Sequence, residues 1–580
     1  MHRTAEITSS ALEAVRADIA HLFEQHAVVE SLPGYAYGVL CAGGLAISEA
    51  GGTLSLDEAK APDADALFRI ASMTKSFTAA AIIKLREMRQ LQLSDDVREW
   101  VPEFSNAVLP TRDTAAITVF DLLTMRAGMP QDDPWADRQL YRDDDSLSDL
   151  FAEGMSFSNP PGIKFEYSNY AYILLGRIIT RASGRPSMQF ITEELLRPLG
   201  MASTVWHPED ATCPIANGYQ LGPDGWRQEP LMPNGGDVAA FAGLYSNVRD
   251  LCQWMHFFLD AWPPRDDVER MPLARAARRE MQTAASLQPP ELSTGSISGW
   301  PEAMAGGYGF GLQINQRNFG WSAGHGGGLP GFGSHMRWLP ELGVGVVALA
   351  NKTYAPMQEP VDAALRCIAR AAEPVRQRVL PSAPLLVARD GIIRLLSEWD
   401  DVLADEIFAD NFFADRKRTE WQQAFVALHT AHGGFGYPEG FAVPNRLRGR
   451  FRIAAARGAL DVWVTLAPTR VPKVQLLRFF SIIPPPSALT AALDAIVAAV
   501  NDVADETASL NLAATPAIQT GIARTLRLAR LRCGSLRKGA LLAGDGETRA
   551  TWRLHGANRD YELELEVDAG SRLVACGLSR

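Results

Sequence analysis

The C-terminal third of the chain contains a repeat, and this repeat restricts what that third can fold into. Phe451-Arg452-Ile453 is matched 101 residues later by Trp552-Arg553-Leu554. The same offset relates two alternating apolar stretches, 460–466 and 561–567, as half-buried strands require. It also relates two apolar stripes at helical spacing, 392–402 and 493–503. Because one offset preserves a strand period and a helix period, we predict two copies of a small α+β module, each with its helix first and antiparallel strands after.

The rest of the chain predicts a larger domain with strands at its two ends. Apolar runs at 35–41 and 45–50 flank a Gly-Gly turn, and further strand patterns lie at 321–325, 334–339 and 344–350. Helix-forming segments occupy much of the interval between them. This order favours one antiparallel sheet that is built from both ends of the domain and flanked by helices.

The length of 580 residues exceeds what one hydrophobic core supports, so several domains are expected. Prolines at 374–390 indicate a linker, and Pro484-Pro485-Pro486 separates the two repeats. We predict a catalytic domain over 1–375, a first α+β module over 388–484 and a second over 487–580.

Charge and composition argue against several classes of partner. The net charge of −11 disfavours a nucleic acid, and we interpret the arginine-rich stretch 524–537 as a solvated face. No apolar run reaches the length of a membrane span, and the N-terminus lacks the pattern of a secretion signal, so we expect a cytoplasmic protein. The six cysteines form no C-x-x-C pair, and His429 and His432 lack further ligands nearby, so we expect neither a metal nor a cofactor.

Ser72 and Lys75 form the pattern that carries the predicted chemistry. A spacing of three places both side chains on one face of a helical turn, and free N–H groups at a helix start favour developing negative charge. A lysine with a lowered pKa could take the hydroxyl proton, so that the serine oxygen attacks a carbonyl carbon. Ser535 and Lys538 share this spacing by chance, and we interpret them as a surface pair.

The surroundings of Ser72 resemble a known family. Residues 68–75 read FRIASMTK, which is similar to the nucleophile segment of the serine β-lactamase-related hydrolases. This family includes class C β-lactamases, D-alanyl-D-alanine carboxypeptidases, D-aminopeptidases and related esterases. Tyr167 and Asn169, after a Pro-Gly turn, match its Tyr-x-Asn element, and the run from His325 to Gly328 matches its Lys/His-x-Gly strand. The resemblance covers about residues 10–375 and implies a penicillin-binding-protein-like α/β fold.

The resemblance also implies a role for each matched residue. Tyr167 would share a proton with Lys75 and Ser72 and pass it to the leaving group. Asn169 would hydrogen-bond Lys75 and a substrate amide, and His325 would complete the proton network on the opposite wall. The N–H groups of Ser72 and Gly328 would form the oxyanion hole, and Gly327 would let substrate approach the backbone closely.

A second Tyr-x-Asn, at Tyr245 and Asn247, could simply cap the next helix. The same explanation is open for the first copy, and only the family order and the Pro-Gly turn favour Tyr167. The segment 124–128, TMRAG, departs from the commoner family run, and the sequence offers no reason for this. The modules begin with a helix, so their likeness to cystatin-like or nuclear-transport-factor-like folds is an analogy.

These observations favour a serine hydrolase that acts through an acyl-serine on a small amide, a short peptide or an ester. A D-amino-acid-containing peptide fits this class. His325 in place of lysine makes a β-lactamase or a D-alanyl-D-alanine carboxypeptidase the alternative, beside an acyl-transferase and, more remotely, a non-catalytic binding protein. The expected partner is a small molecule or a short peptide, and self-association through the C-terminal modules stays open. The loops 129–145 and 208–236 would form the pocket walls, but their residues do not fix a substrate.

Overall fold

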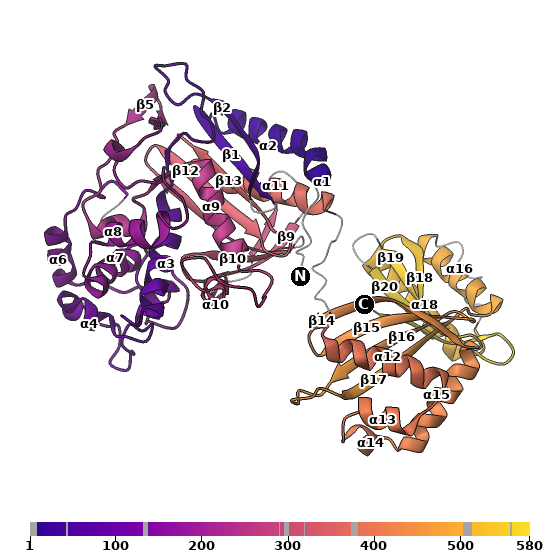
Figure 1. The fold of residues 1–580 in the computed structure, drawn as a ribbon. Coiled ribbons are helices and arrows are strands. Elements are labelled where there is room, and N and C mark those ends of the chain that lie inside the picture. Colours follow the sequence, from indigo (N-terminus) through magenta and orange to yellow (C-terminus); the bar gives the residue numbers. More distant parts are fainter. Residues whose placement is uncertain are drawn as a thin grey trace. The chain divides into compact units, whose positions relative to one another are not determined.

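A computed structural model of the chain describes residues 9–41, 44–131, 137–288, 291–294, 301–317, 320–372, 381–502, 513–556 and 560–579. The chain divides into two compact units, 1–377 and 378–580 (Figure 1). The helices of the first unit are α1 (Ser9–Ala14), α2 (Arg16–Val29), α3 (Thr74–Glu87), α4 (Val97–Trp100), α5 (Val119–Leu123), α6 (Asp144–Glu153), α7 (Asn169–Ser183), α8 (Ser187–Ile191), α9 (Val248–Leu259), α10 (Arg275–Met281) and α11 (Gln358–Ala371).

One antiparallel sheet forms the centre of the first unit, in the order β2-β1-β13-β12-β11-β10-β9-β7, with β8 paired to β9. Its strands are β1 (Gly34–Cys41), β2 (Gly44–Gly52), β7 (Ser286–Leu287), β8 (Glu291–Thr294), β9 (Pro301–Tyr308), β10 (Gln313–Arg317), β11 (Gly320–Leu329), β12 (Phe332–Leu339) and β13 (Val344–Ala350). Strands from both ends of the unit meet where β1 pairs β13, for example at Val39 and Val346. The predicted antiparallel sheet flanked by helices is therefore confirmed.

Helices cover both faces of this sheet (Figure 1). On one face, α2 and α11 enclose a core in which the rings of Phe23 and Tyr37 stack at 3.9 Å. On the other face lies α9, and a larger core there also includes α3 and α7. All residues of β1 and β13 are buried, because both of their faces are covered. None of the described helices is both long and apolar enough to cross a membrane.

The second unit contains one eight-stranded sheet, in the order β14 to β21 along the chain. The first copy of the repeat provides α12 (Ala383–Ser397), α13 (Asp401–Ile407), α14 (Phe412–Asp415), α15 (Arg418–His432), β14 (Phe435–Asn445), β15 (Arg448–Ala455), β16 (Ala459–Leu466) and β17 (Val474–Ile483). The second copy provides α16 (Ser487–Asn501), α18 (Pro516–Cys533), β18 (Leu536–Asp545), β19 (Arg549–Gly556), β20 (Asp560–Val567) and β21 (Leu573–Ser579). Both copies are α+β, and β15 and β16 recur at an offset of 101 as β19 and β20.

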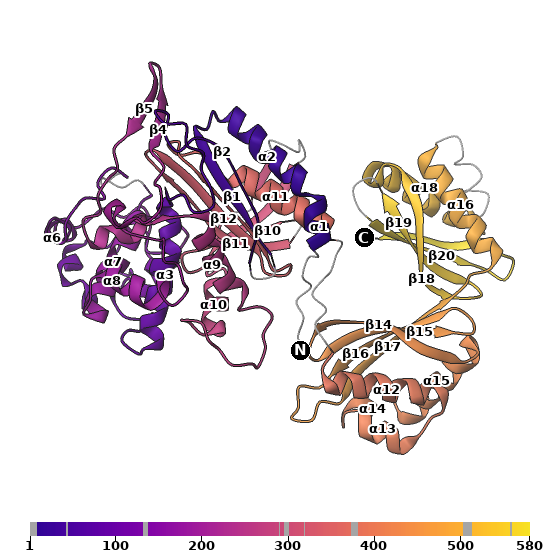
Figure 2. The same cartoon turned by 45° about the horizontal axis from the view of Figure 1, so that its top comes forward.

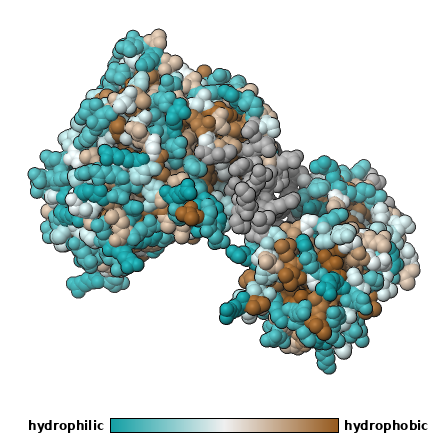
Figure 3. All heavy atoms as spheres, viewed as in Figure 1, coloured by the Kyte–Doolittle hydropathy of each residue, from teal (hydrophilic) through white to brown (hydrophobic). Residues whose placement is uncertain are grey.

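The two copies join side by side, since β17 pairs β18 in parallel at Ile482 and Ile483. All other neighbours in this sheet are antiparallel. The strand order is kept between the copies while the strand direction is inverted, so their helices lie on opposite faces of the sheet (Figure 2). The predicted module boundary near residue 484 thus lies within one compact unit. On the visible side of this unit, apolar residues gather around α12 (Figure 3).

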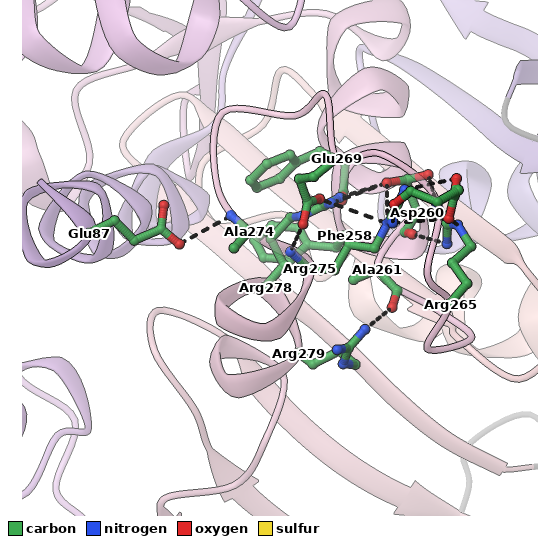
Figure 4. A network of polar contacts seen from close by, with 12 residues as sticks. Glu87, Phe258, Asp260, Ala261, Arg265, Glu269, Ala274, Arg275, Arg278 and Arg279 are labelled. Carbon is green, nitrogen blue, oxygen red and sulfur yellow. Dashed lines mark hydrogen bonds and ion pairs between the residues drawn. The ribbon is translucent and has the colours of Figure 1, made fainter.

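A polar network fixes α10 beside the helix that carries Lys75 (Figure 4). The fully buried guanidinium of Arg278 pairs with Asp260 at 3.1 Å and with Glu269. Glu87, at the end of α3, accepts a hydrogen bond of 3.1 Å from the N–H of Ala274. Because a buried cation needs nearby negative charge, this network stabilises the loop between α9 and α10.

Candidate active site

Ser72 lies in a short 3-10 turn, Ala71–Met73, directly before α3. The strand β3 (Phe68–Arg69) leads into this turn and pairs with β6 (Tyr245–Ser246). Ala71 has φ 49°, a left-handed conformation that costs a non-glycine residue about 1–2 kcal/mol. The strain brings Ser72 to the N-terminal end of α3, where the helix dipole favours negative charge. The helix expected to begin near Ser72 thus begins at Thr74, two residues later.

Lys75 is fully buried and joins three segments of the chain. Its Nζ lies 3.0 Å from Ser72 Oγ, 2.7 Å from Asn169 Oδ1 and 3.1 Å from the carbonyl oxygen of Phe241. The amide and carbonyl oxygens can only accept, so they orient two N–H bonds of the lysine. The Ser72 hydroxyl can also donate, so a proton can pass from Ser72 to the amine along this contact.

Tyr167 lies between Lys75 and His325. Its ring centre is 4.9 Å from Lys75 Nζ and 6.1 Å from the centre of the His325 ring. The segment 124–128 holds the loop that carries this tyrosine. The carbonyl oxygen of Met125 accepts a 2.9 Å hydrogen bond from the N–H of Glu166, and Arg126 donates to the Gly162 carbonyl. The unusual segment 124–128 (TMRAG) thus holds the Tyr167 loop in place through hydrogen bonds, a role that the sequence did not reveal.

The structure separates the two Tyr-x-Asn copies. In the first copy Ser168 caps α7, while Asn169 turns its amide oxygen to Lys75. In the second copy Asn247 caps α9 through the N–H of Asp250, at 2.8 Å. Tyr245 is fully buried, and its ring lies 4.9 Å from the guanidinium carbon of Arg69.

His325 is buried, and both of its ring nitrogens face groups of the protein. Nδ1 lies 2.6 Å from the carbonyl oxygen of Gly326, which can only accept, so Nδ1 carries the proton. Nε2 lies 3.0 Å from the hydroxyl of Tyr308. Burial lowers the pKa of His325 to about 3. The imidazole is therefore neutral, and Nε2 accepts a hydrogen bond from Tyr308.

The glycines of β11 permit close packing against the Ser72 segment. A Cβ at Gly327 would lie 2.2 Å from the carbonyl oxygen of Ile70 and 3.0 Å from Cβ of Ala71. A Cβ at Gly328 would meet the side chain of Tyr354 at 2.8 Å. The backbone of β11 thus reaches the residues before Ser72 only because position 327 has no side chain.

The structure therefore brings Ser72, Lys75, Tyr167, Asn169 and His325 together, with Gly327 beside them. The contact of Tyr308 with His325 was not predicted. Neither was the Phe241 carbonyl, because no sequence signal marks a backbone oxygen.

The other candidate groups have separate contacts. Lys538 lies on β18 and pairs with Asp494 at 2.5 Å. His429 contacts the Leu396 carbonyl, and His432 contacts the Arg457 carbonyl and the Ser481 hydroxyl. Within the described ranges, no group of three or more His, Cys, Asp or Glu side chains is placed to hold a metal ion.

Comparisons with known proteins agree on this unit. The family model described as Beta-lactamase matches residues 19–370. The D-alanyl-D-alanine-carboxypeptidase/endopeptidase AmpH of Escherichia coli K12 is 26% identical over 310 residues, which are 50% of this chain and 72% of AmpH. The unguisins hydrolase ungD' of Aspergillus campestris is 30% identical over 303 residues, 50% of this chain and 53% of that protein.

One solved structure aligns with nearly the whole chain. It is the octameric penicillin-binding protein homologue from Pyrococcus abyssi, with a TM-score of 0.50 and 18% identity. The alignment covers 97% of this chain and 99% of the other. At this identity the match supports the fold alone.

Proposed function

Because this chain belongs to the beta-lactamase family and is a serine hydrolase, we propose that Ser72 is its nucleophile and that it cleaves small amides, short peptides or esters. The observation that carries this proposal is the contact of Lys75 Nζ with Ser72 Oγ at 3.0 Å, held by Asn169 and Phe241. The fold alone would not support it, since a fold hosts many activities.

In the proposed reaction, Lys75 takes the hydroxyl proton as Ser72 Oγ bonds to the substrate carbonyl carbon. The N–H groups of Ser72 and Gly328 stabilise the negative charge on the carbonyl oxygen. Tyr167 then passes a proton to the leaving nitrogen or oxygen as its bond to the carbonyl carbon breaks, and Lys75 returns the serine proton to Tyr167. A water molecule gives a proton to Lys75 as its oxygen bonds to the acyl carbon, and the same network protonates Ser72 Oγ as its bond to that carbon breaks, which releases the acid and free Ser72.

His325 is the reason to prefer neutral substrates over β-lactams and D-alanyl-D-alanine termini. Both of those carry a carboxylate close to the scissile bond, and a cation is the group best suited to bind it. Both His325 nitrogens are engaged within the protein, so this side chain offers neither charge nor a free N–H. AmpH, by its name, acts as a D-alanyl-D-alanine carboxypeptidase and endopeptidase, so that activity remains the alternative to test.

The test combines covalent labelling with a substrate panel. A fluorophosphonate probe should add one label to the wild-type chain, seen by intact mass, and none to Ser72→Ala. Ser535→Ala, which changes the chance copy of the motif, should label like wild type. D-amino-acid amides, short acyl esters, nitrocefin and a D-alanyl-D-alanine peptide are then compared by kcat/KM. Labelling that persists in Ser72→Ala refutes the nucleophile, and a preference for nitrocefin or the D-alanyl-D-alanine peptide refutes the substrate class.

A further inference from the structure

Among the helices that the structure describes, none covers one face of the strands of the first copy. Along β15 and β16, the residues that face α12–α15 are apolar and buried, among them Phe451, Ile453, Val462 and Val464. The alternate residues point the other way, and we call this surface the open face. It carries Arg448, Arg450, Trp463, Leu476 and Arg478, all exposed.

The open face is hollowed and basic. A hollow of about 1390 Å³ is lined by these five residues, by Arg446 and by one carboxylate, that of Asp415, among others. Trp463 pairs across the sheet with Arg450 on one side and with Arg478 on the other. The guanidinium of Arg450 lies 5.2 Å from the Trp463 ring and also pairs with Asp461. Among the described residues, no carboxylate pairs with Arg446, Arg448 or Arg478.

The second copy of the repeat shows that the module fold does not require this surface. The residue equivalent to Trp463 is Glu564, whose cross-strand neighbours are Thr551 and Gly577. The first copy thus has Arg450, Trp463 and Arg478 in a row, side by side on three strands, where the second copy has Thr551, Glu564 and Gly577. Arg549, the equivalent of Arg448, forms an ion pair with Glu564. The second copy therefore neutralises its charge within the same sheet, whereas in the first copy Arg448 and Arg478 have no carboxylate partner in the part of the chain that the structure describes.

The neighbouring cross-strand pair, in contrast to this row, has the same charges in both copies. Arg452 faces Asp461 in the first copy, and Arg553 faces Glu562 in the second. A pair of opposite charges at this position is retained in both copies, as expected of a contact that supports the sheet. At Arg450, Trp463 and Arg478, by contrast, the second copy has Thr551, Glu564 and Gly577, so the basic and aromatic character of the open face belongs to the first copy.

We propose that the open face binds an acidic peptide segment that also carries apolar side chains. Guanidinium groups bind carboxylates through two parallel hydrogen bonds, and unpaired ones keep this capacity free. Trp463 is 41% exposed and Leu476 is 43% exposed, so apolar side chains of the peptide would gain contact there. The hollow exceeds the 300–1,000 Å³ typical of small-molecule pockets, and a segment of several residues fits it better.

A single-stranded nucleic acid is the competing occupant, and the surface favours it less. Such ligands use successive aromatic platforms along a basic track. Among the residues that line the hollow, Trp463 is the sole aromatic side chain, and three leucines and two prolines also line it. These aliphatic groups suit peptide side chains rather than stacked bases.

The test measures peptide binding to the full chain by fluorescence anisotropy. The probe is a fluorescein-labelled hexapeptide in which Glu alternates with Leu and Phe. Its controls are the same peptide with Gln for Glu and a labelled ten-residue oligothymidylate. The double variant Arg448→Ser/Arg478→Ser and the variant Trp463→Ala change the open face, and Arg549→Ser changes the equivalent site of the second copy. Thermal unfolding checks that each variant is folded.

We expect the Glu peptide to bind, and to bind at least tenfold more weakly to the double variant, to Trp463→Ala and at raised salt. Arg549→Ser should bind like wild type, and the Gln peptide should lose at least tenfold. Hydrogen exchange on the wild-type chain gives a second measurement, in which the bound peptide slows exchange in β15–β17 and not in β19–β21. Equal binding of the Gln peptide, no binding at millimolar concentration, unchanged binding by the double variant, or tighter binding of the oligonucleotide would overturn the proposal.

Discussion

The contact between Tyr308 and His325 gives the sharpest test of the site geometry. Tyr308→Phe removes the hydroxyl that lies 3.0 Å from Nε2 and keeps the buried ring. Nδ1 stays bound to the Gly326 carbonyl, so the imidazole cannot satisfy Nε2 by changing tautomer. Nε2 then loses the hydroxyl that donates to it. Leaving a buried acceptor unpaired costs about 1–3 kcal/mol, which should appear as a lower free energy of unfolding.

Tyr245→Phe is a matched control in the same unit. Tyr245 is as deeply buried as Tyr308, but among the described residues its hydroxyl has no hydrogen-bond partner. Removing an unpaired buried hydroxyl relieves a desolvation cost of about 1–3 kcal/mol, so this variant should be as stable as wild type or more stable. Arg69 can keep its contact with the ring face, since phenylalanine retains the ring.

Urea unfolding of both variants, followed by tryptophan fluorescence and by residual hydrolase activity, gives the two free energies. The rate of ester hydrolysis provides a second readout. Tyr308→Phe should lower kcat about tenfold with little change in KM, because His325 loses its orientation, and Tyr245→Phe should leave both constants unchanged. If Tyr308→Phe unfolds at the same urea concentration as wild type and reacts at the same rate, Tyr308 does not position His325. If both variants lowered the free energy of unfolding equally, the loss would not depend on whether the hydroxyl has a hydrogen-bond partner.

Three further predictions follow from the same geometry. Lys75→Met should lower kcat/KM by about 10²–10⁴, measured on an acyl ester, because the base is lost while the buried volume is kept; a loss under tenfold contradicts the proposed base. Gly327→Ala should abolish measurable hydrolysis and reduce stability, because its Cβ would clash with the Ile70 backbone. In Gly328→Ala the new Cβ would clash only with the side chain of Tyr354, so this variant should fold and lose far less activity and stability. Equal effects of the two variants would show that β11 does not approach the Ser72 segment at Gly327. The pKa of His325 is about 3 in the folded chain and about 6.5 in the unfolded chain, so between these pH values only the unfolded chain binds a proton at this residue. The free energy of unfolding should therefore fall by up to about 1.4 kcal/mol per pH unit as the pH decreases from 6.5 to 3. His325→Asn should remove this part of the slope in urea titrations at several pH values, and an unchanged slope would show that His325 is protonated in the folded state.

Several strands could be predicted from the sequence because their side chains alternate. The pattern at 460–466 corresponds to β16, and that at 344–350 corresponds to β13. The strands β9 and β10 were not predicted. A run such as 301–308, PEAMAGGY, has no apolar alternation, and its strand conformation depends on pairing with β10 at Ile314 and neighbouring residues. Pairing of that kind is a property of the assembled sheet and leaves little trace in the local pattern.

In the candidate site, too, some contacts could be predicted from the sequence and others could not. The spacing of Ser72 and Lys75 sufficed to propose their contact, because three residues span one helical turn. The contact of Tyr308 with His325 joins β9 to β11 across β10, so it depends on the register of three strands. The open face has one feature that follows from the local sequence pattern and one that depends on strand register. The alternation at 460–466 is consistent with Trp463 pointing away from the buried residues, but it could not place Arg450 and Arg478 beside it.

The sequence by itself indicated candidate residues for the chemistry and where the repeat lies, because spacing and period are local properties of the chain. Only the tertiary structure decided that His325 is neutral, since its proton position follows from a carbonyl and a hydroxyl that folding brings to it. It also decided that the two copies share one sheet with helices on opposite faces, because the parallel pairing of β17 with β18 sets their relative direction. The physical reason is common to both: burial and strand register arise from contacts between distant segments, and a local pattern does not contain them.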